Sequence, residues 1–145
     1  PYYFSHICIK NNFTTKITLA GRSINDSMSL NIQKKIGKIF KNKNLIKKNK
    51  ILICGLTYKK NVADIRNSYA LEIYMKLKKD FKSVFAYDKY CNKYNQKKYK
   101  VMNKLKSMSK YDLIVFLVDH NYNKKLFNSI KTKKIKYYDP FRYYL

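Results

Sequence analysis

The sequence predicts an α/β protein, in which a Rossmann-like parallel sheet is preceded by one long central helix. Three observations predict this fold class. The runs 51–54 (ILIC) and 113–118 (LIVFLV) are apolar at every position, as is typical of strands covered on both faces. From residue 51 onward, strand and helix signals alternate, which favours a parallel sheet with right-handed crossovers. Within 24–40, apolar residues recur at steps of three and four, which indicates an amphipathic helix.

The helix predicted over 24–40 follows an aromatic start, 1–21, which we also expect to be helical. Asn25 or Asp26 can cap the predicted helix by accepting a free backbone N–H. The apolar stripe of the helix consists of Met28, Ile32, Ile36, Ile39 and Phe40. Such a stripe has to pack on another surface, and either the following domain or a second copy of the helix could supply it.

A lysine- and asparagine-rich connector, 41–50 (KNKNLIKKNK), separates the helix from the sheet and is the clearest boundary in the chain. We therefore predict a helical region over 1–45 and an α/β domain over 50–145. The expected elements of the second region are a strand over 51–54, a helix capped by Asn67 or Ser68, a strand over 83–87, a short strand and a short helix within 89–110, a strand over 113–118, a helix near 124–130 and a strand over 135–138.

Composition excludes several classes of protein. No apolar run approaches the roughly 20 residues that span a membrane, and the N-terminus lacks the basic head of a secretory signal. Because the chain does not begin with Met, we expect it to begin inside a longer protein. The three cysteines have no metal-binding or CxxC spacing, and with only two histidines the sequence predicts no metal site. Unpaired cysteines favour a reducing cytoplasm.

The formal net charge of +25 raises the possibility of a nucleic-acid-binding protein. Of the 33 basic residues only Arg22, Arg66 and Arg142 are arginine, which leaves 30 lysines. Proteins that recognise bases or phosphates favour Arg, because its planar guanidinium binds in a bidentate manner. Lysine here accompanies abundant Asn, Ile and Tyr, as in the products of AT-rich genomes. We therefore expect a solvated lysine surface that binds polyanions only non-specifically.

The first strand-to-helix turn, GLTYKKNVADIRNS, does not carry the G-x-G-x-x-G pattern of dinucleotide-binding domains. Gly55 stands alone, and we expect Leu56 and Tyr58 to block the approach of a pyrophosphate to the backbone. Asp88 ends the second strand as a ribose-binding acid would, but it lies over 30 residues beyond Gly55, compared with about 20 in the fingerprint. We interpret Asp88 as a turn residue.

The same turn can form a site for a phosphate-bearing sugar. Lys59 and Lys60 lie at the carboxyl end of a strand, where open α/β sheets bind ligands. Tyr58 offers a ring against which a base or sugar can rest, and Arg66 precedes a helix N-terminus, which favours anions. The alternative interpretation is a pair of surface lysines and a loop stabilised by an Asp64–Arg66 ion pair.

Three blocks of the sequence resemble a known family. The block GLTYKKNVADIRNSYALEIYMKLKK, with VFAYD after it, is similar to the opening of the UDP-binding domain of the UDP-glucose/UDP-mannose dehydrogenase family. The block KYDLIVFLVDHNYNKKL resembles a later strand of that domain, which ends in a polar His. The block PYYFSHICIKNNF, followed by ITLAGRSINDSM, resembles the segment after the family's catalytic cysteine. The last block is most similar to the UDP-N-acetylglucosamine/galactosamine 6-dehydrogenase branch. Lys89 stands where the family has Pro.

This resemblance implies an enzyme with an N-terminal NAD-binding domain, a central dimerisation region with a long helix, whose end covers 1–45 of this chain, and a UDP-binding domain over 50–145. Two NAD-dependent oxidations would convert the 6-hydroxyl of a UDP-N-acetylhexosamine into a carboxylate for surface polysaccharide synthesis. The nucleophilic cysteine would lie just before Pro1, so this chain holds no catalytic residue and should not reduce NAD alone. The helix would pair with its dimer mate, so we expect its apolar stripe to be poorly covered within one copy.

The resemblance also assigns ligands residue by residue. Tyr58 and Lys59 match the aromatic-lysine pair that contacts the UDP-sugar, and Arg22 matches an Arg placed near the substrate. Arg66 matches the Arg that reaches NAD across the domain cleft. Arg142 lies where a late substrate-contacting Arg would be, although its spacing departs from the family's. The expected partners are a UDP-sugar and a second copy of the chain, in the cytoplasm, with no specific nucleic acid and no membrane. Two rival interpretations are a polyanion-binding basic protein and a non-catalytic UDP-binding dimerisation module.

Overall fold

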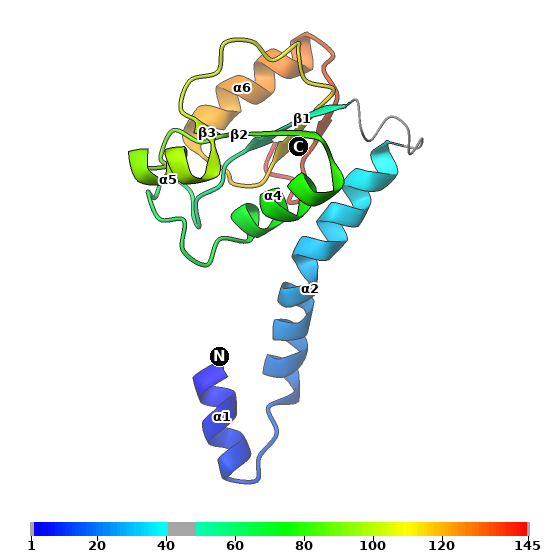
Figure 1. Ribbon diagram of the computed structural model, residues 1–145. Helices are drawn as coiled ribbons and strands as arrows, with labels where there is room; N and C mark the ends of the chain where they lie inside the picture. The colour runs from blue at the N-terminus through cyan, green and yellow to red at the C-terminus, as the bar shows by residue number, and fades with distance from the viewer. Residues whose placement is uncertain (1, 41–48, 145) are drawn as a thin grey trace.

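The predicted fold class is confirmed by the computed structural model, which describes residues 2–40 and 49–144 (Figure 1). All pairings in the sheet are parallel, and the strand order is β3-β2-β1-β4-β5. The strands are β1 (Lys50–Cys54), β2 (Ser83–Tyr87), β3 (Val101–Met102), β4 (Leu113–Phe116) and β5 (Tyr137–Tyr138). The helices are α1 (Tyr2–Lys10), α2 (Lys16–Ile39), α4 (Tyr69–Asp80), α5 (Lys93–Tyr99) and α6 (Asn121–Thr132).

The two apolar runs form the interior strands β1 and β4, as predicted. Each strand lies between two neighbours, and residues 51–54 and 113–116 are completely buried. Strand β4 ends at Phe116, two residues before the end of the apolar run 113–118, but Leu117 and Val118 are still buried. Ile51 and Ile53 face one layer of the core, while Leu52 and Cys54 face the other. Apolar character at every position therefore reflects burial on both faces.

Two helical layers cover the sheet. One layer contains α4 and the C-terminal half of α2, whose Ile32 and Ile36 join the same core cluster as Ile73 and Leu77. The other layer contains α6, whose Phe127 and Ile130 pack with the opposite side chains of β1 and β4. The chain passes from β1 to β2 on one side of the sheet and from β4 to β5 on the other, so the direction of the connections reverses between β1 and β4. This reversal is why α4 and α6 lie on opposite faces. In open α/β sheets the carboxyl ends of such a strand pair are where ligands bind.

The long helix differs from its prediction in two respects. It begins at Lys16 after Thr15 rather than at a cap formed by Asn25 or Asp26. In addition, the expectation that its apolar stripe would be poorly covered is wrong. Ile32 and Ile36 are 4% and 0% exposed, because the C-terminal half of α2 packs against α4 of the same chain. Met28 and Ile39 are partly buried against the same cluster.

Most of the exposed large apolar side chains among the described residues lie in the N-terminal part of the chain. Figure 1 shows α1 and the beginning of α2 extending from the sheet as a helical arm. Buried Thr15 donates a hydrogen bond from its hydroxyl to that of Ser5 at 2.9 Å, which joins the two helices. The exposed apolar side chains of the arm are Tyr3, Phe4, Ile7, Ile9, Phe13, Ile17, Leu19, Ile24 and Leu30. Ile17 is 90% exposed.

The remaining elements follow the predicted order with shifted ends. Ser68, one of two predicted caps, accepts the Leu71 N–H at 3.2 Å and begins α4. The region 89–110 contains α5 and β3, and the last helix and strand are α6 and β5. The predicted connector falls mainly on 41–48, outside the described residues. None of the helices described is long and apolar enough to cross a bilayer.

Candidate functional site

The carboxyl ends of β1 and β4 meet because Gly55 allows close contact. Its φ of +88° lies in the region that favours glycine, and a Cβ built on it would lie 2.6 Å from the Val118 Cβ. The turn that follows, residues 55–61, therefore begins directly against the chain leaving β4. This contact places the predicted Tyr58–Lys59 pair at the switch point of the sheet.

Asp88 holds the beginning of this turn from inside the protein. Its Oδ2 accepts the backbone N–H groups of Leu56 and Thr57 at 2.7 and 3.0 Å, and its Oδ1 accepts that of Tyr90 at 2.8 Å. Burial raises the pKa of this carboxyl, but hydrogen bonds from His120, Leu56 and Thr57 outweigh burial and lower the pKa to about 2. Asp88 is therefore an ionised turn residue, which agrees with its interpretation from the sequence.

His120 holds the end of the same turn. The imidazole is completely buried; its Nε2 lies 3.2 Å from Asp88 Oδ2 and 3.1 Å from Thr57 Oγ1, and its Nδ1 accepts the Asn61 N–H at 2.9 Å. Lys60 Nζ also lies 2.9 Å from Asp119 Oδ2, in an ion pair between the turn and the segment after β4. Sequence reasoning did not assign a contact to His120. Its signals in the sequence were its place directly after the most apolar strand and the polar His of the resembling family block.

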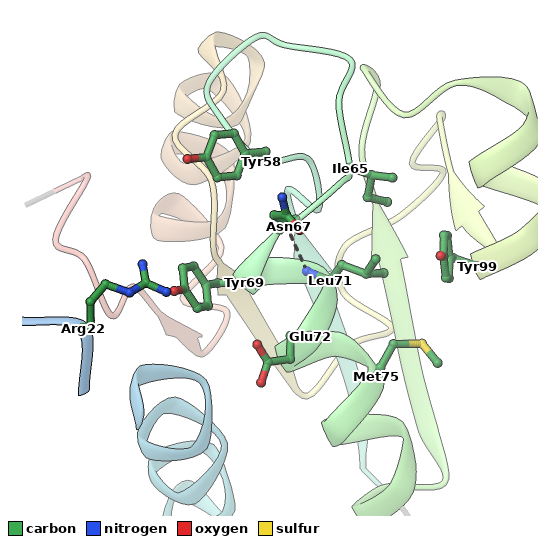
Figure 2. A pocket seen from close by; sticks show the side chains of 10 residues that line it. Arg22, Tyr58, Ile65, Asn67, Tyr69, Leu71, Glu72, Met75 and Tyr99 are labelled. Atoms are coloured by element: carbon green, nitrogen blue, oxygen red, sulfur yellow. Dashed lines mark hydrogen bonds between the residues drawn. The ribbon is translucent and has the colours of Figure 1, made fainter. Parts of the chain in front are cut away.

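An open crevice of about 870 Å³ lies beside the turn, between α2 and the first turns of α4. Figure 2 shows Arg22 of α2 pointing toward Tyr69, with Tyr58 above them and Glu72 below. A smaller cavity of about 250 Å³ shares Tyr58 and Tyr69 and reaches Leu117 and Val118 at the switch point. The lining of the crevice combines three phenolic rings, a guanidinium, the polar start of a helix and the Glu72 carboxylate. The rings, the guanidinium and the helix start suit an anionic ligand with a flat base.

Three of the four predicted ligand-binding residues lie at or next to this crevice. Tyr58 is 49% exposed and lines both cavities. Lys59 is exposed, and its Nζ lies 5.3 Å from the centroid of the Tyr58 ring, in a cation–π arrangement. No carboxylate in the described part of the chain pairs with Lys59. Arg22 lines the crevice and also lies 3.2 Å from Asp26.

Arg66 does not line the crevice. Its side chain is 85% exposed and forms a two-point contact with Asp64, with Nε 3.0 Å from Oδ1 and Nη2 2.8 Å from Oδ2. The side-chain hydrogen bond from Arg66 lowers the pKa of Asp64 to about 2. This is the loop-stabilising pair weighed as an alternative from the sequence. Arg142 is also exposed, in a turn with a φ of 57°.

The turn after β1 does not fit the pyrophosphate of a dinucleotide, for a different reason than the sequence indicated. Leu56 is completely buried and blocks nothing outside the core. Instead, the Leu56 and Thr57 amides, which a phosphate would need, are already bound to the Asp88 carboxylate.

The fold defines a Rossmann-like α/β domain with an open crevice beside the turn after β1, and comparison with known proteins identifies its family. Residues 52–141 match the model of the UDP-glucose/GDP-mannose dehydrogenase family, UDP binding domain. The chain belongs to this family. The family's second nucleotide sugar is GDP-mannose, where the sequence analysis named UDP-mannose.

Relatives of known name cover most of the chain. It is 33% identical over 129 residues to UDP-N-acetyl-D-mannosamine dehydrogenase of Methanocaldococcus jannaschii, covering 86% of this chain and 29% of that protein. It is 29% identical over 130 residues to UDP-N-acetyl-D-glucosamine 6-dehydrogenase of Salmonella typhi, covering 87% and 30%. A structure of the UDP-N-acetyl-mannosamine dehydrogenase Cap5O from S. aureus aligns with a TM-score of 0.68 at 27% identity, covering 96% and 35%. The chain thus spans about 30% of the length of the curated relatives.

Proposed function

We propose that this chain is the UDP-binding part of an NAD-dependent UDP-N-acetylhexosamine 6-dehydrogenase, which oxidises the sugar 6-hydroxyl to a carboxylate for surface polysaccharide synthesis. The observation that carries the proposal is the Tyr58–Lys59 pair, held at the switch point beside an open crevice in a chain of this family. The names of the relatives support an N-acetylhexosamine as the sugar. In this proposal residues 1–45 belong to the central dimerisation region and 50–145 form the UDP-binding domain.

Each proposed ligand contact follows from the chemistry of the crevice. The Lys59 ammonium has no carboxylate partner among the residues described, so it is available to a diphosphate oxygen. Tyr58 bounds the pocket with its exposed ring, and Arg22 supplies a second positive charge from α2. Arg66 would meet NAD from the other side of the domain cleft. NAD, when bound, accepts hydride from the sugar carbon.

The thiols of the α/β domain are not suited to catalysis. Burial raises the pKa of the Cys54 thiol far above its usual range and that of Cys91 to about 11. In line with the family resemblance, the proposed nucleophile is a cysteine that this chain does not contain. We place the enzyme in the cytoplasm, and the absence of a disulfide among Cys8, Cys54 and Cys91 is consistent with this location.

The proposed homodimer forms through the helical arm rather than through the stripe first predicted. Most of the exposed large apolar side chains described lie on or between α1 and α2, including Ile17 and Ile24 at 90% and 66% exposure. An exposed apolar surface of this kind is typical of a protein interface. When Ile17 and Ile24 are both changed to Lys, the sedimentation coefficient of the protein should shift toward that of the monomer. An unchanged dimer would exclude this surface as the dimer interface.

A binding experiment separates the proposed function from simple polyanion binding. The chain is titrated by calorimetry with UDP and with ADP, at about 0.1 M and about 0.5 M salt. A nucleotide-sugar site binds UDP more tightly than ADP at both salt concentrations. A lysine surface that attracts any polyanion would bind ADP and UDP alike and would lose both at high salt. The second pattern would overturn the proposal.

A further inference from the structure

Two completely buried side chains, Asp88 and His120, serve the site without lining the crevice. Asp88 binds the amides of Leu56 and Thr57, at the beginning of the turn. His120 binds the Thr57 hydroxyl and the Asn61 amide, at its end. The three residues between these anchors, 58–60, are exposed and include the two ligand contacts proposed for the turn, Tyr58 and Lys59. The contacts thus fix the two ends of the segment that carries Tyr58 and Lys59.

The end of this turn is in a backbone conformation that needs outside support. Asn61 has a φ of 56°, in the left-handed region that residues other than glycine adopt uncommonly. Its N–H donates to His120 Nδ1 at 2.9 Å, and its side-chain oxygen accepts the Asn121 N–H at 3.1 Å. Both contacts join the turn to the segment after β4. Neither contact involves the exposed residues 58–60, which include the residues proposed to meet the ligand.

We propose that Asp88 and His120 are positioning residues, which hold the turn so that Tyr58 and Lys59 already occupy their ligand-binding positions before a UDP-sugar arrives. This inference rests on the proposed function of the turn. A turn ordered in advance loses less conformational freedom on binding, so part of the affinity for the nucleotide originates in the buried pair. Neither residue touches the ligand in this account.

The hydrogen bonds define the role of each imidazole nitrogen. Because Nδ1 accepts the Asn61 N–H, the proton of the neutral ring lies on Nε2, where Asp88 Oδ2 can accept it. One nitrogen of His120 therefore accepts a hydrogen bond from the turn, and the other donates one to Asp88. Each of two substitutions removes one of these hydrogen bonds. In His120→Gln the terminal amide occupies the place of Nε2, whereas in His120→Asn it occupies the place of Nδ1.

The experiment compares these two variants in the 145-residue chain. Amide hydrogen exchange of Asn61 and Thr57 is measured by NMR, UDP affinity by calorimetry, and cooperative unfolding in urea confirms that each variant folds. His120→Gln should retain the bond to Asp88, expose the Asn61 amide to faster exchange and weaken UDP binding by about 2- to 12-fold, the range that one hydrogen bond represents. His120→Asn should retain protection of Asn61, lower the urea midpoint more, and bind UDP more tightly than His120→Gln.

The outcomes separate this inference from the proposed function. If the Asn61 amide exchanges faster in His120→Gln while UDP affinity equals that of the original chain, the buried pair is structural only and the inference is overturned. Unchanged exchange in His120→Gln would overturn it as well. If the original chain does not bind UDP at all, the proposed function fails instead, whatever the exchange rates show.

Discussion

Replacing Asp88 with Asn removes a buried carboxylate that accepts hydrogen bonds at both oxygens. Oδ2 accepts from Leu56, Thr57 and His120, and Oδ1 accepts from the Tyr90 amide. An Asn side chain keeps one oxygen and places an NH₂ group at the other position, where it faces donors that have lost their acceptor. An unsatisfied buried donor costs about 1–3 kcal/mol.

The pKa of Asp88 gives a second measure of the same contacts. It is lowered from 3.8 to about 2 in the folded protein, because the hydrogen bonds outweigh the opposing effect of burial. At about 1.36 kcal/mol per pKa unit, this shift contributes roughly 2–3 kcal/mol to stability at neutral pH. Because the folded pKa is depressed, the contribution is fully present above the unfolded pKa, near pH 4. It is lost as the pH falls through about 2.

Urea unfolding of the original chain and of Asp88→Asn, at pH 7 and in steps down to pH 2, tests this reasoning. At pH 7 we expect Asp88→Asn to lower the free energy of unfolding by roughly 1–3 kcal/mol, the range in which the unsatisfied donors and the pKa shift agree as two measures of the same contacts. The difference between the two proteins should shrink between about pH 4 and pH 2, as Asp88 itself takes up a proton. A difference below about 0.5 kcal/mol at pH 7, or one that is constant with pH, would refute it.

Three further predictions follow from the packing and the site. Gly55→Ala should lower the free energy of unfolding by roughly 2–4 kcal/mol, because its Cβ meets Val118 at a positive φ; a loss below about 0.5 kcal/mol would contradict the close contact. Ile36→Ala should lower the free energy of unfolding by about 2–5 kcal/mol, whereas Ile17→Ala should lower it by under about 0.5 kcal/mol in the monomer. Equal losses of stability in the two variants would contradict the burial described for α2. The purified chain should form no NADH from NAD and any UDP-N-acetylhexosamine, and measurable NADH would require a nucleophile within the chain.

Burial on both faces made the interior strands predictable, since β1 and β4 are apolar at every position in the sequence. The long helix was harder. The polar residues around Asn25 look like a cap, but the helix continues through them to Lys16, where Thr15 and Ser5 contact each other across the turn between α1 and α2. The surface against which its apolar stripe packs could also not be predicted, because periodicity shows that a face of the helix is apolar but not which surface covers it.

The site was predictable where neighbouring residues carry it and not where distant residues meet. Tyr58 and Lys59 follow a buried strand directly, so the turn could be selected from local sequence. Tyr69 and Glu72 line the crevice because α4 begins beside the turn, which only the fold reveals. The contact between Asp88 and His120 joins residues 32 positions apart, and it depends on the order of the strands in the sheet.

The central claim, that the turn after β1 binds the nucleotide of a UDP-sugar, is tested most directly by titrating UDP into Lys59→Ala and Lys82→Ala. Lys82 is also exposed, but it precedes β2 at the opposite edge of the sheet, so both changes remove one surface charge and only one alters the site. Loss of a charge-assisted hydrogen bond worth roughly 1.5–3 kcal/mol predicts a 10- to 150-fold weaker affinity for Lys59→Ala, with Lys82→Ala unchanged. Equal affinities in the two variants would remove Lys59 from the site and contradict the account.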